Sequence, residues 1–535
     1  MSAVDKPWSR HVPDGAWDYI VVGSGMGGMV AAAMLSKLGR RVLVLEQHYV
    51  PGGFTHTFRR KQWTWDVGVH AVGEVTRHSM PGRLLASLTD DRLQWASLGP
   101  VYDEFHFPDG FRIDFPDSPQ RFRDNLLAAF PHERAAIDGY LARVRDVAGS
   151  MKGYYLSRLL PSGRIASAAD RIFARRALAS LHARTSEVIG SLTRDPRLAS
   201  VLTAQWGYYG APPSRASFAM QALVTRHFIH GGYYPVGGSA AIARELLRTV
   251  EAGGGHTVVH ADVARIVVED GRVRGVALTD GRTLAAPRVV SAAGVAATVT
   301  RLLPPSLAQA SWSRDVAALA PAPAHVCLYL GFRGDIRTAG ASAANKWFYE
   351  TWSSEAEAWQ IDGPDPLPEA PVLYCSFPSL KDPQHDPGPE QLHTGEVVTF
   401  VPWSMFERFR GLRWRKRGDE YEALKARLQA RLLEQLLSHM PGLREHIAYA
   451  ELSTPASTDH FVRPMQGSIY GLAPTPERFA TAALRPRAPI DGLFFAGSEV
   501  ATVGVIGAAM GGVLAAMAAE PVRGARWMPR AVGRG

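Results

Sequence analysis

The chain is poor in cysteine, and its longest apolar stretch is interrupted by polar residues and glycines. Only Cys327 and Cys375 occur in 535 residues, which excludes a disulfide framework and a cysteine-based metal site. This scarcity favours a reducing compartment, and no apolar run typical of a signal peptide precedes residue 18. The stretch 493–519 contains Glu499 and several glycines, so we expect a buried strand, turn and helix there rather than a membrane span.

Motifs for metal and acyl-transfer chemistry are also missing. The 18 histidines are scattered, with no H-E-x-x-H sequence and no paired-ligand spacing. No G-x-S-x-G nucleophile turn is present either. We therefore expect neither a metal site nor a serine hydrolase.

Positive charge is in excess, with a formal net charge of +9 and a pI of about 9.5. The basic residues accompany no nucleic-acid-binding motif. In the segment 151–184 they alternate with apolar residues and face a single acid, Asp170, which favours peripheral contact with a membrane surface over a solvated helical face. A second basic cluster, 408–417, precedes a charged segment at 420–437 that we expect to be a solvated helix. We expect a cytoplasmic protein associated peripherally with the inner face of the membrane.

The most informative positive feature is the segment 18–46, DYIVVGSGMGGMVAAAMLSKLGRRVLVLE, which reads as strand, glycine-rich turn, helix, strand and acid. Gly23, Gly25 and Gly28 have the G-x-G-x-x-G spacing that permits a tight turn, close approach of backbone to a pyrophosphate, and close packing of helix on sheet. Glu46 ends the second strand, about twenty residues beyond the glycines, where a carboxylate accepts hydrogen bonds from ribose hydroxyls. The segment predicts a site for the ADP half of a dinucleotide.

Local features favour FAD over NAD as the bound dinucleotide. Gly52 and Gly53 follow Glu46 and permit backbone to crowd the pyrophosphate and ribityl chain. Near the C-terminus, Glu499 is predicted to hydrogen-bond the ribityl or pyrophosphate region, and a helix beginning near Gly504 is predicted to direct its N-terminus at the flavin. We also assign three further residues to the cofactor site, Val263, Gly497 and Gly507.

Only one such dinucleotide unit occurs, so we expect an external electron donor, either NAD(P)H or a redox protein. The fold class is α/β: a discontinuous Rossmann-like FAD-binding domain combined with a mixed α+β substrate domain. Hairpin turns at Asp270-Gly271 and Asp280-Gly281 and buried strands near 289–294 and 492–497 supply later parts of the nucleotide domain. We expect FAD-binding blocks at 15–89, 226–300 and 466–520, substrate-domain blocks at 90–225 and 301–465, and a tail at 521–535.

Several of these segments resemble the group of flavoproteins that includes phytoene desaturases, carotenoid isomerases and retinol saturases, with the retinol saturase branch most similar. The motifs are DVGVH (66–70), YPVGGS (234–239), SFPSLKDP (376–383), STPASTDHF (453–461), GSIYGL (467–472) and GLFFAGSEVATVGVIGAAMGG (492–512). The branch usually carries an aspartate at the position of Glu499. The resemblance spans nearly the whole chain and implies an amine-oxidase-like fold, bound FAD and an extended apolar polyene or isoprenoid substrate.

The resemblance implies reduction of a C=C bond of a retinoid, carotenoid or related isoprenoid by hydride from flavin N5, with a proton added to the neighbouring carbon. His70, Glu74 and Tyr470 are the candidate catalytic residues; His70 and Glu74 follow a segment that, by the resemblance, passes beside the flavin. Dense aromatics such as Tyr208 and Trp347 either line a polyene tunnel or belong to ordinary core. The alternatives are isomerisation or desaturation of the same substrate class, amine oxidation, and a flavin-free lipid carrier.

Overall fold

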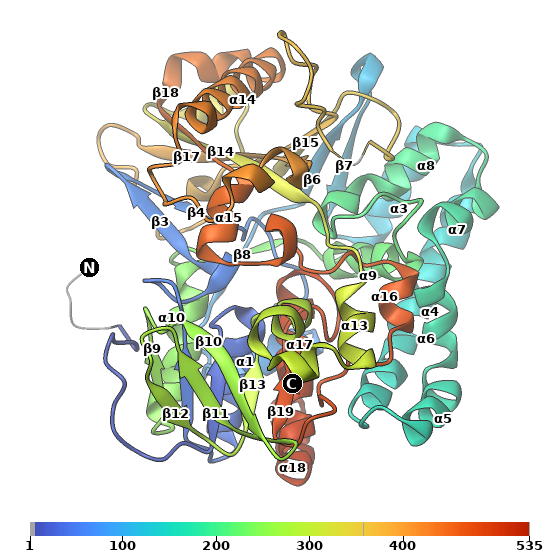
Figure 1. Cartoon of the computed structure of the whole chain (residues 1–535). Coiled ribbons are helices and arrows are strands. Elements are labelled where there is room, and N and C mark those ends of the chain that lie inside the picture. The colour runs from blue at the N-terminus through green and yellow to red at the C-terminus, as the bar shows by residue number, and fades with distance from the viewer. Residues whose placement is uncertain (1–5, 357, 534–535) are drawn as a thin grey trace.

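A computed structural model describes residues 6–356 and 358–533, so the first five residues of the N-terminal segment lie outside it. The chain forms a nucleotide lobe, a lobe built on a large, mainly antiparallel sheet, and a helical lobe that joins them on one side (Figure 1). Both sheets are assembled from segments that are far apart in the sequence.

The nucleotide lobe contains a five-stranded parallel sheet in the order β19-β13-β1-β2-β9. Its strands are almost wholly apolar and buried on both faces, as parallel strands covered by helices must be. They are β1 (Tyr19–Val22), β2 (Val42–Leu45), β9 (His256–Val258), β13 (Val289–Ser291) and β19 (Leu493–Phe495). The predicted discontinuous Rossmann-like sheet is therefore confirmed.

Helices α1 (Met26–Lys37), α10 (Ala240–Ala252) and α17 (Gly504–Ala519) pack beside this sheet. The crossing of α1 and α17 is so close that a Cβ on Gly512 would lie 2.3 Å from the Gly27 carbonyl oxygen. None of the helices in the described ranges is both long enough and apolar enough to cross a bilayer. The prediction of a buried strand, turn and helix at 493–519 is thus confirmed by β19 and α17.

A three-stranded antiparallel sheet follows β9, formed by β10 (Val263–Glu269), β11 (Arg272–Leu278) and β12 (Thr283–Ala285). The two predicted hairpin turns join these strands, and Asp270 adopts a left-handed φ of 50° before Gly271. The sequence GGYYPVGGS at 231–239 predicts a turn before a helix, and the structure differs from this prediction. Residues Tyr233–Pro235 form strand β8 instead, because their extended backbone pairs antiparallel with β5 (Trp95–Ser97).

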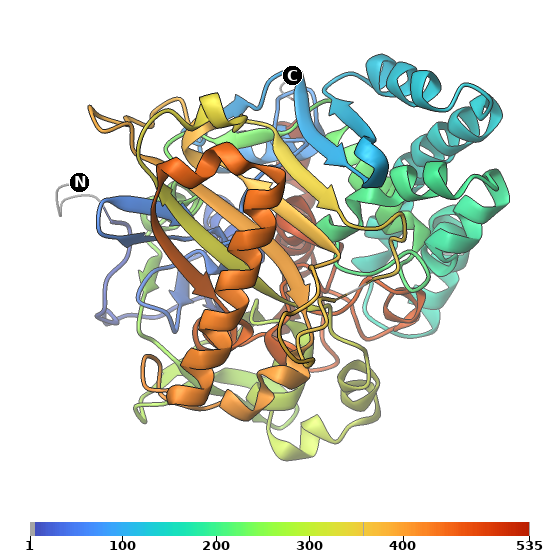
Figure 2. The ribbon, with the colours of Figure 1, turned by 90° about the horizontal axis from the view of Figure 1, so that it is seen from above.

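The second lobe is built on a seven-stranded sheet in the order β18-β14-β17-β16-β15-β6-β7. Its strands are β6 (Val101–His106), β7 (Arg112–Pro116), β14 (Ala324–Phe332), β15 (Asn345–Tyr349), β16 (Val372–Ser376), β17 (His393–Val401) and β18 (Ile447–Ser453). Helix α14 (Asp419–His439) lies across one face of this sheet, as the view from above shows (Figure 2). On the other side, β4 (Trp63–Asp66), paired with β3 (Thr57–Arg60), contacts β17.

The helical lobe covers the right side of Figure 1. It comprises α3 (Pro119–Ala129), α4 (Arg134–Arg158), α5 (Arg164–Phe173), α6 (Arg175–His182), α7 (Thr185–Leu192), α8 (Pro196–Thr203) and α9 (Phe218–Phe228). The remaining longer helices are α2 (Met80–Leu88), α13 (Ser311–Ala317), α15 (Pro455–Phe461), α16 (Pro476–Ala480) and α18 (Pro521–Val532). In Figure 1, α5 and α18 both lie at the lower end of the molecule.

Candidate nucleotide and substrate cavity

One cavity of about 1340 Å³ joins the glycine-rich turn of the nucleotide lobe to the helical lobe. Its lining comes from β1, α1, α4, α9, β17 and α17, elements that span most of the chain. Nearly all the predicted site residues lie along it: Gly23, Gly25, Glu46, Gly53, His70, Glu74, Val263, Tyr470, Gly497, Glu499, Gly504 and Gly507. Of the predicted site residues, Gly28 and Gly52 do not line it.

The three glycines of the turn occupy three different environments. Gly23 has a φ of +93°, which an L side chain rarely adopts. A Cβ on Gly25 would meet nothing within 4 Å and would project into the cavity, whereas a Cβ on Gly28 would lie 2.1 Å from the Gly23 carbonyl oxygen. Gly25 therefore leaves backbone exposed for a ligand, and Gly28 permits the helix to pack against the strand.

Glu46 ends β2 with its carboxylate turned toward this glycine-rich turn. One oxygen accepts a hydrogen bond from the amide of His48 at 2.8 Å, and the other accepts from the amide of Ser24 at 3.0 Å and from the Ser24 hydroxyl. These contacts fix the carboxylate at the cavity wall. The assignment of Glu46 to a ribose remains a prediction.

The second glycine pair, Gly52-Gly53, lies directly against the first turn. Both residues have positive φ, +124° and +56°, and a Cβ on Gly53 would lie 3.0 Å from the Cα of Gly25. Two side-chain-free turns thus meet beside the N-terminus of α1, where backbone N–H groups and the helix dipole favour a pyrophosphate. The open space at Gly25 and the buried carboxylate of Glu46 fit the ADP portion of FAD.

At the other end of the nucleotide lobe, Glu499 follows β19. Its carboxylate is buried and accepts hydrogen bonds from three backbone amides, those of Val295 at 2.6 Å, Ala296 at 3.0 Å and Leu472 at 3.2 Å. The side chain therefore joins β19 to the N-terminus of the short helix after β13. Helix α17 begins at Gly504, as predicted, and the φ of this residue is +84°. The first turn of α17 lines the cavity. Contacts of Glu499 and Gly504 with a flavin remain predictions.

His70 follows β4 and contacts an acid that the sequence analysis did not identify, Glu396 of β17. His70 Nδ1 lies 2.8 Å from Glu396 Oε2, a contact at ion-pair distance, and neither atom forms a hydrogen bond within the described residues. Burial lowers the pKa of His70 to about 3 and raises the pKa of Glu396 to about 8. Near neutral pH the Glu396 carboxyl group is therefore protonated and the His70 imidazole is neutral.

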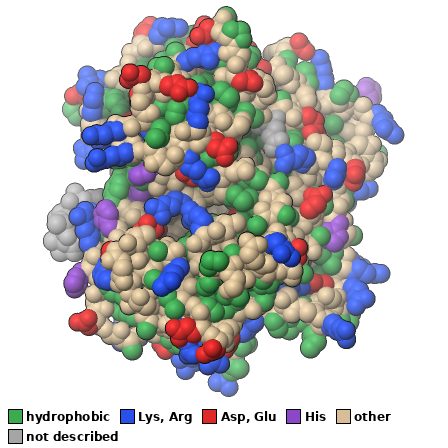
Figure 3. Space-filling model, in the orientation of Figure 1, with side chains coloured by type: hydrophobic (Ala, Val, Ile, Leu, Met, Phe, Trp, Pro, Cys, Tyr) green, Lys and Arg blue, Asp and Glu red, His purple; other side chains and the backbone are tan. Residues whose placement is uncertain are grey.

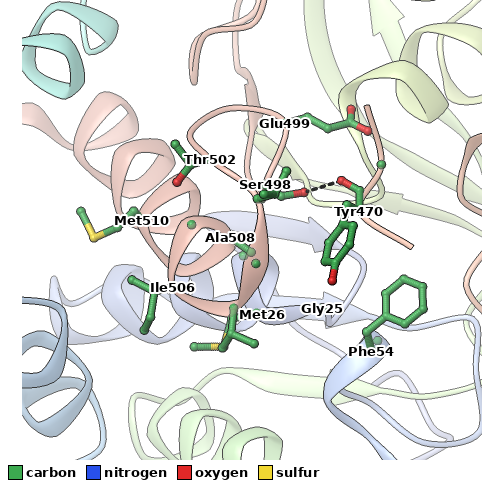
Figure 4. Close-up of a pocket in the computed structure, with 18 of the residues that line it drawn as sticks. Gly25, Met26, Phe54, Tyr470, Ser498, Glu499, Thr502, Ile506, Ala508 and Met510 are labelled. Carbon is green, nitrogen blue, oxygen red and sulfur yellow. Dashed lines mark hydrogen bonds between the residues drawn. The ribbon is translucent and has the colours of Figure 1, made fainter. Parts of the chain in front are cut away.

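The other two candidate catalytic residues are held differently. The Tyr470 hydroxyl donates a hydrogen bond to the Gly207 carbonyl oxygen at 3.0 Å, and burial raises the pKa of Tyr470. In Figure 4 the ring of Tyr470 extends toward Phe54, whereas Ile506 lies on the other side of the view. Glu74 lies near His227, with Oε2 3.6 Å from Nδ1, and its pKa is lowered by His227 and Arg226 despite burial.

The dense aromatic groups divide between cavity wall and core. Tyr208 and Trp347 line the cavity, with ring centroids 5.0 Å apart. Tyr209, Phe348 and Tyr349 are buried in core clusters instead. Trp347 also belongs to a core cluster, and a role of Tyr208 and Trp347 in a polyene tunnel remains a prediction.

The cavity extends from the glycine-rich turns to a second end in the helical lobe. There its lining consists of the beginning of α2, the second half of α4 and the end of α18, including Met80, Leu156 and Met528. Polar residues also line this end, namely Lys152 and Arg145 of α4 and His78 and Ser79 just before α2, among mainly apolar side chains. An elongated apolar molecule fits such a channel.

Comparisons with known proteins agree with this arrangement. The family described as flavin containing amine oxidoreductase matches residues 26–519. An all-trans-retinol 13,14-reductase of Danio rerio is 30% identical over 92% of this chain and 84% of its own, and that of Homo sapiens is 29% identical over 95% and 86%. A chloroplastic prolycopene isomerase of Arabidopsis thaliana is 26% identical over 95% and 83%. Cyclohexylamine oxidase from Brevibacterium oxydans superimposes with a TM-score of 0.59 and 18% identity over 96% of this chain and 100% of its own, a likeness of fold.

Proposed function

The chain belongs to the flavin containing amine oxidoreductases, and from that premise we propose that it reduces a C=C bond of a retinoid, carotenoid or other apolar polyene. It is an FAD-dependent oxidoreductase. The observation that carries the proposal is the cavity of about 1340 Å³ that connects the glycine-rich turns to a mainly apolar channel. The similarity to retinol 13,14-reductases supports the substrate class and the direction of the reaction.

Bound reduced flavin supplies the hydride for such a reaction. The protein itself contributes a wall that excludes water and holds an extended chain in one orientation. Met220, Leu223 and Val224 of α9 form one part of that wall, and Val398 and Phe400 of β17 form another. His70 lies on the same wall, so a double bond held there has a titratable group beside it.

The electron donor is external in this proposal and is either NAD(P)H or a redox protein. Only the β1-α1-β2 unit, within the described residues, combines a parallel strand pair, a glycine-rich turn and a terminal acid. That unit is assigned to FAD, which leaves no second dinucleotide fold for a nicotinamide cofactor.

Peripheral membrane contact through α5 supplies the substrate in this proposal. Ile165, Ile172 and Phe173 of α5 are 77%, 72% and 67% exposed, far more than apolar side chains of a packed helix. Arg164, Arg171, Arg175 and Arg176 lie beside them, and Figure 3 shows basic side chains on this lower right edge. The backbone of Phe173 packs on Gly153 of α4, so the exposed patch adjoins the channel lining at Lys152 and Leu156.

Replacing the three exposed side chains together, Ile165→Gln, Ile172→Gln and Phe173→Gln, is expected to weaken binding to vesicles of anionic lipid by about 1000-fold or more, because each apolar side chain buried in the interface contributes about 1.5–3 kcal/mol. Vesicle cosedimentation measures this. Leu412→Gln, at an exposed apolar residue within the other basic cluster, is the matched control and leaves binding unchanged. Equal binding of the triple variant and the wild type would contradict a membrane contact at α5.

Product analysis after anaerobic mixing of reduced enzyme with polyenes tests the proposed reaction. We expect a gain of two hydrogens in the product and reoxidation of the flavin. A loss of two hydrogens would indicate desaturation, and an unchanged mass with altered absorbance would indicate isomerisation, an activity for which the similarity to prolycopene isomerase speaks. A colourless purified protein would support a lipid carrier instead.

A further inference from the structure

We propose that Glu396 and His70 form a two-residue proton relay that opens into the cavity and protonates the substrate carbon next to the one that receives the hydride. The inference rests on the proposed function, and it adds a residue, Glu396, that does not line the cavity itself. Of the three candidate catalytic residues, the proposal identifies His70 as the one that donates the proton to the substrate.

The geometry gives each of the two residues one defined contact. Glu396 Oε1 accepts a hydrogen bond from the backbone amide of Asp66 at 2.9 Å, which leaves Oε2 for His70 Nδ1 at 2.8 Å. Because Nδ1 is buried against Glu396, the 13% of the His70 side chain that is exposed belongs to the far edge of the ring, which carries Nε2. That edge faces the cavity, which His70 lines.

The backbone of His70 is fixed by a buried lysine. Lys381, in the SFPSLKDP segment, donates hydrogen bonds from Nζ to the His70 carbonyl oxygen at 2.7 Å, to Ser376 Oγ at 2.7 Å and to Asn345 Oδ1. Asp66 is held in turn by the hydroxyl groups of Tyr234 and Ser239. The relay therefore lies in a framework that positions the imidazole without occupying its Nε2.

In this proton transfer, each bond that breaks in the pair is matched by a bond that forms. The Nε2–H bond of His70 breaks as a C–H bond forms on the substrate, and the O–H bond of Glu396 breaks as an Nδ1–H bond forms. The imidazole stays neutral and changes tautomer, and Glu396 becomes a carboxylate. Water that enters after product release returns a proton to Nε2, and the reverse shift restores the Glu396 carboxyl group.

The other candidates lack a comparable proton. The Tyr470 hydroxyl is engaged by the Gly207 carbonyl, and its pKa is raised by burial, so it is a weak acid. Glu74 is ionised at neutral pH because His227 and Arg226 lower its pKa. Burial raises the pKa of Glu396 to about 8, so that its carboxyl group still carries a proton at pH 7.

The charge environment of the relay comes from several elements packed around it. The groups that face Glu396 or His70 are Asp66 and Tyr234 from β4 and β8, Cys327, Tyr329 and His325 from β14, Tyr374 from β16, and Lys381. Lys381 lowers the pKa of Glu396, but desolvation is the larger effect. Asp66, whose pKa burial raises to about 6, titrates in a separate and more acidic range.

Infrared titration of the purified protein tests the stored proton without any turnover. The wild type is expected to show the carbonyl stretch of a protonated carboxyl group that disappears as the pH rises through about 8. Glu396→Gln is expected to lose this band. Glu104→Gln is the matched control, because Glu104 is a buried carboxylate of the same sheet that pairs with Lys346 at 2.7 Å and does not line the cavity. A wild type without the band would overturn the relay.

Anaerobic stopped-flow reoxidation of the reduced enzyme by a polyene tests the use of that proton. The wild-type rate should fall as the pH rises through about 8, since Glu396 then loses its proton. Glu396→Gln, with flavin content as the check on folding, should react about 100-fold slower or more and lack this inflection. Glu396→Asp should be slow but retain the inflection, and Glu104→Gln should match the wild type.

A Glu396→Gln variant with the rate and pH profile of the wild type would overturn the relay. A reduced wild type that reacts with no polyene would instead refute the proposed reaction. In that case the infrared band decides alone whether Glu396 stores a proton.

Discussion

A Gly25→Val variant is expected to fold normally and to lose its flavin. The φ and ψ of Gly25, −64° and 171°, suit any L residue, and a Cβ there meets no atom within 4 Å. The added side chain would occupy the part of the cavity between the two glycine turns, where the pyrophosphate is predicted to lie. We expect flavin affinity to fall about 100-fold or more, which corresponds to about 2.8 kcal/mol. Flavin absorbance after gel filtration measures the loss.

The companion variant Gly28→Ala tests the packing of the helix on the sheet, whereas Gly25→Val tests the approach of the ligand to the backbone. Its Cβ would lie 2.1 Å from the Gly23 carbonyl oxygen and 3.0 Å from Ala292 Cβ, so the helix must shift away from the sheet. We expect the flavin-free protein to lose about 1–3 kcal/mol of unfolding free energy, whereas flavin-free Gly25→Val keeps wild-type stability. Gly190→Ala, at an open helical position outside the cavity, is the control for both. A Gly25→Val protein with full flavin content would refute the assignment of this turn.

The nucleotide half of the fold is predictable because its signals are local. The turn glycines, the acid after β2 and the two hairpin dipeptides each occupy a few consecutive residues whose conformation they dictate. The parallel alignment of β13 and β19 with β1 follows once three buried apolar strands share one lobe. The pairing of β8 with β5 was missed, because its partner lies more than a hundred residues earlier in the sequence.

Glu396, the partner of His70, escapes sequence analysis for a different reason. A buried carboxylate looks the same in sequence as a solvated one, and the apolar run of strand β17 begins only at Val397, one residue after Glu396. Only the contact of β4 with β17, which joins segments more than 300 residues apart, brings His70 to Glu396. A charged residue directly before a run of five apolar or β-branched residues was the one available signal.

We expect a second large effect from a substitution that obstructs the outer end of the apolar channel. Gly149 of α4 lines the cavity, and a Cβ there meets no atom within 4 Å, so a Trp at this position should remain folded and extend into the passage. Gly149→Trp is expected to lower kcat/KM for a long polyene by about 100-fold, because the substrate must displace the indole to reach the nucleotide end. Flavin content and reduction by dithionite should not change, since neither requires passage between α2, α4 and α18.

Gly190→Trp provides the matched control for that experiment. Gly190 is also an open, exposed glycine on a helix of the same lobe, but it does not line the cavity. Both tryptophans change helix propensity similarly, so a loss of turnover confined to Gly149→Trp assigns the effect to obstruction. Unchanged kinetics in Gly149→Trp would mean that substrate reaches the cavity by another route. The membrane contact proposed at α5 would then lose its role, because α5 adjoins only this end of the channel.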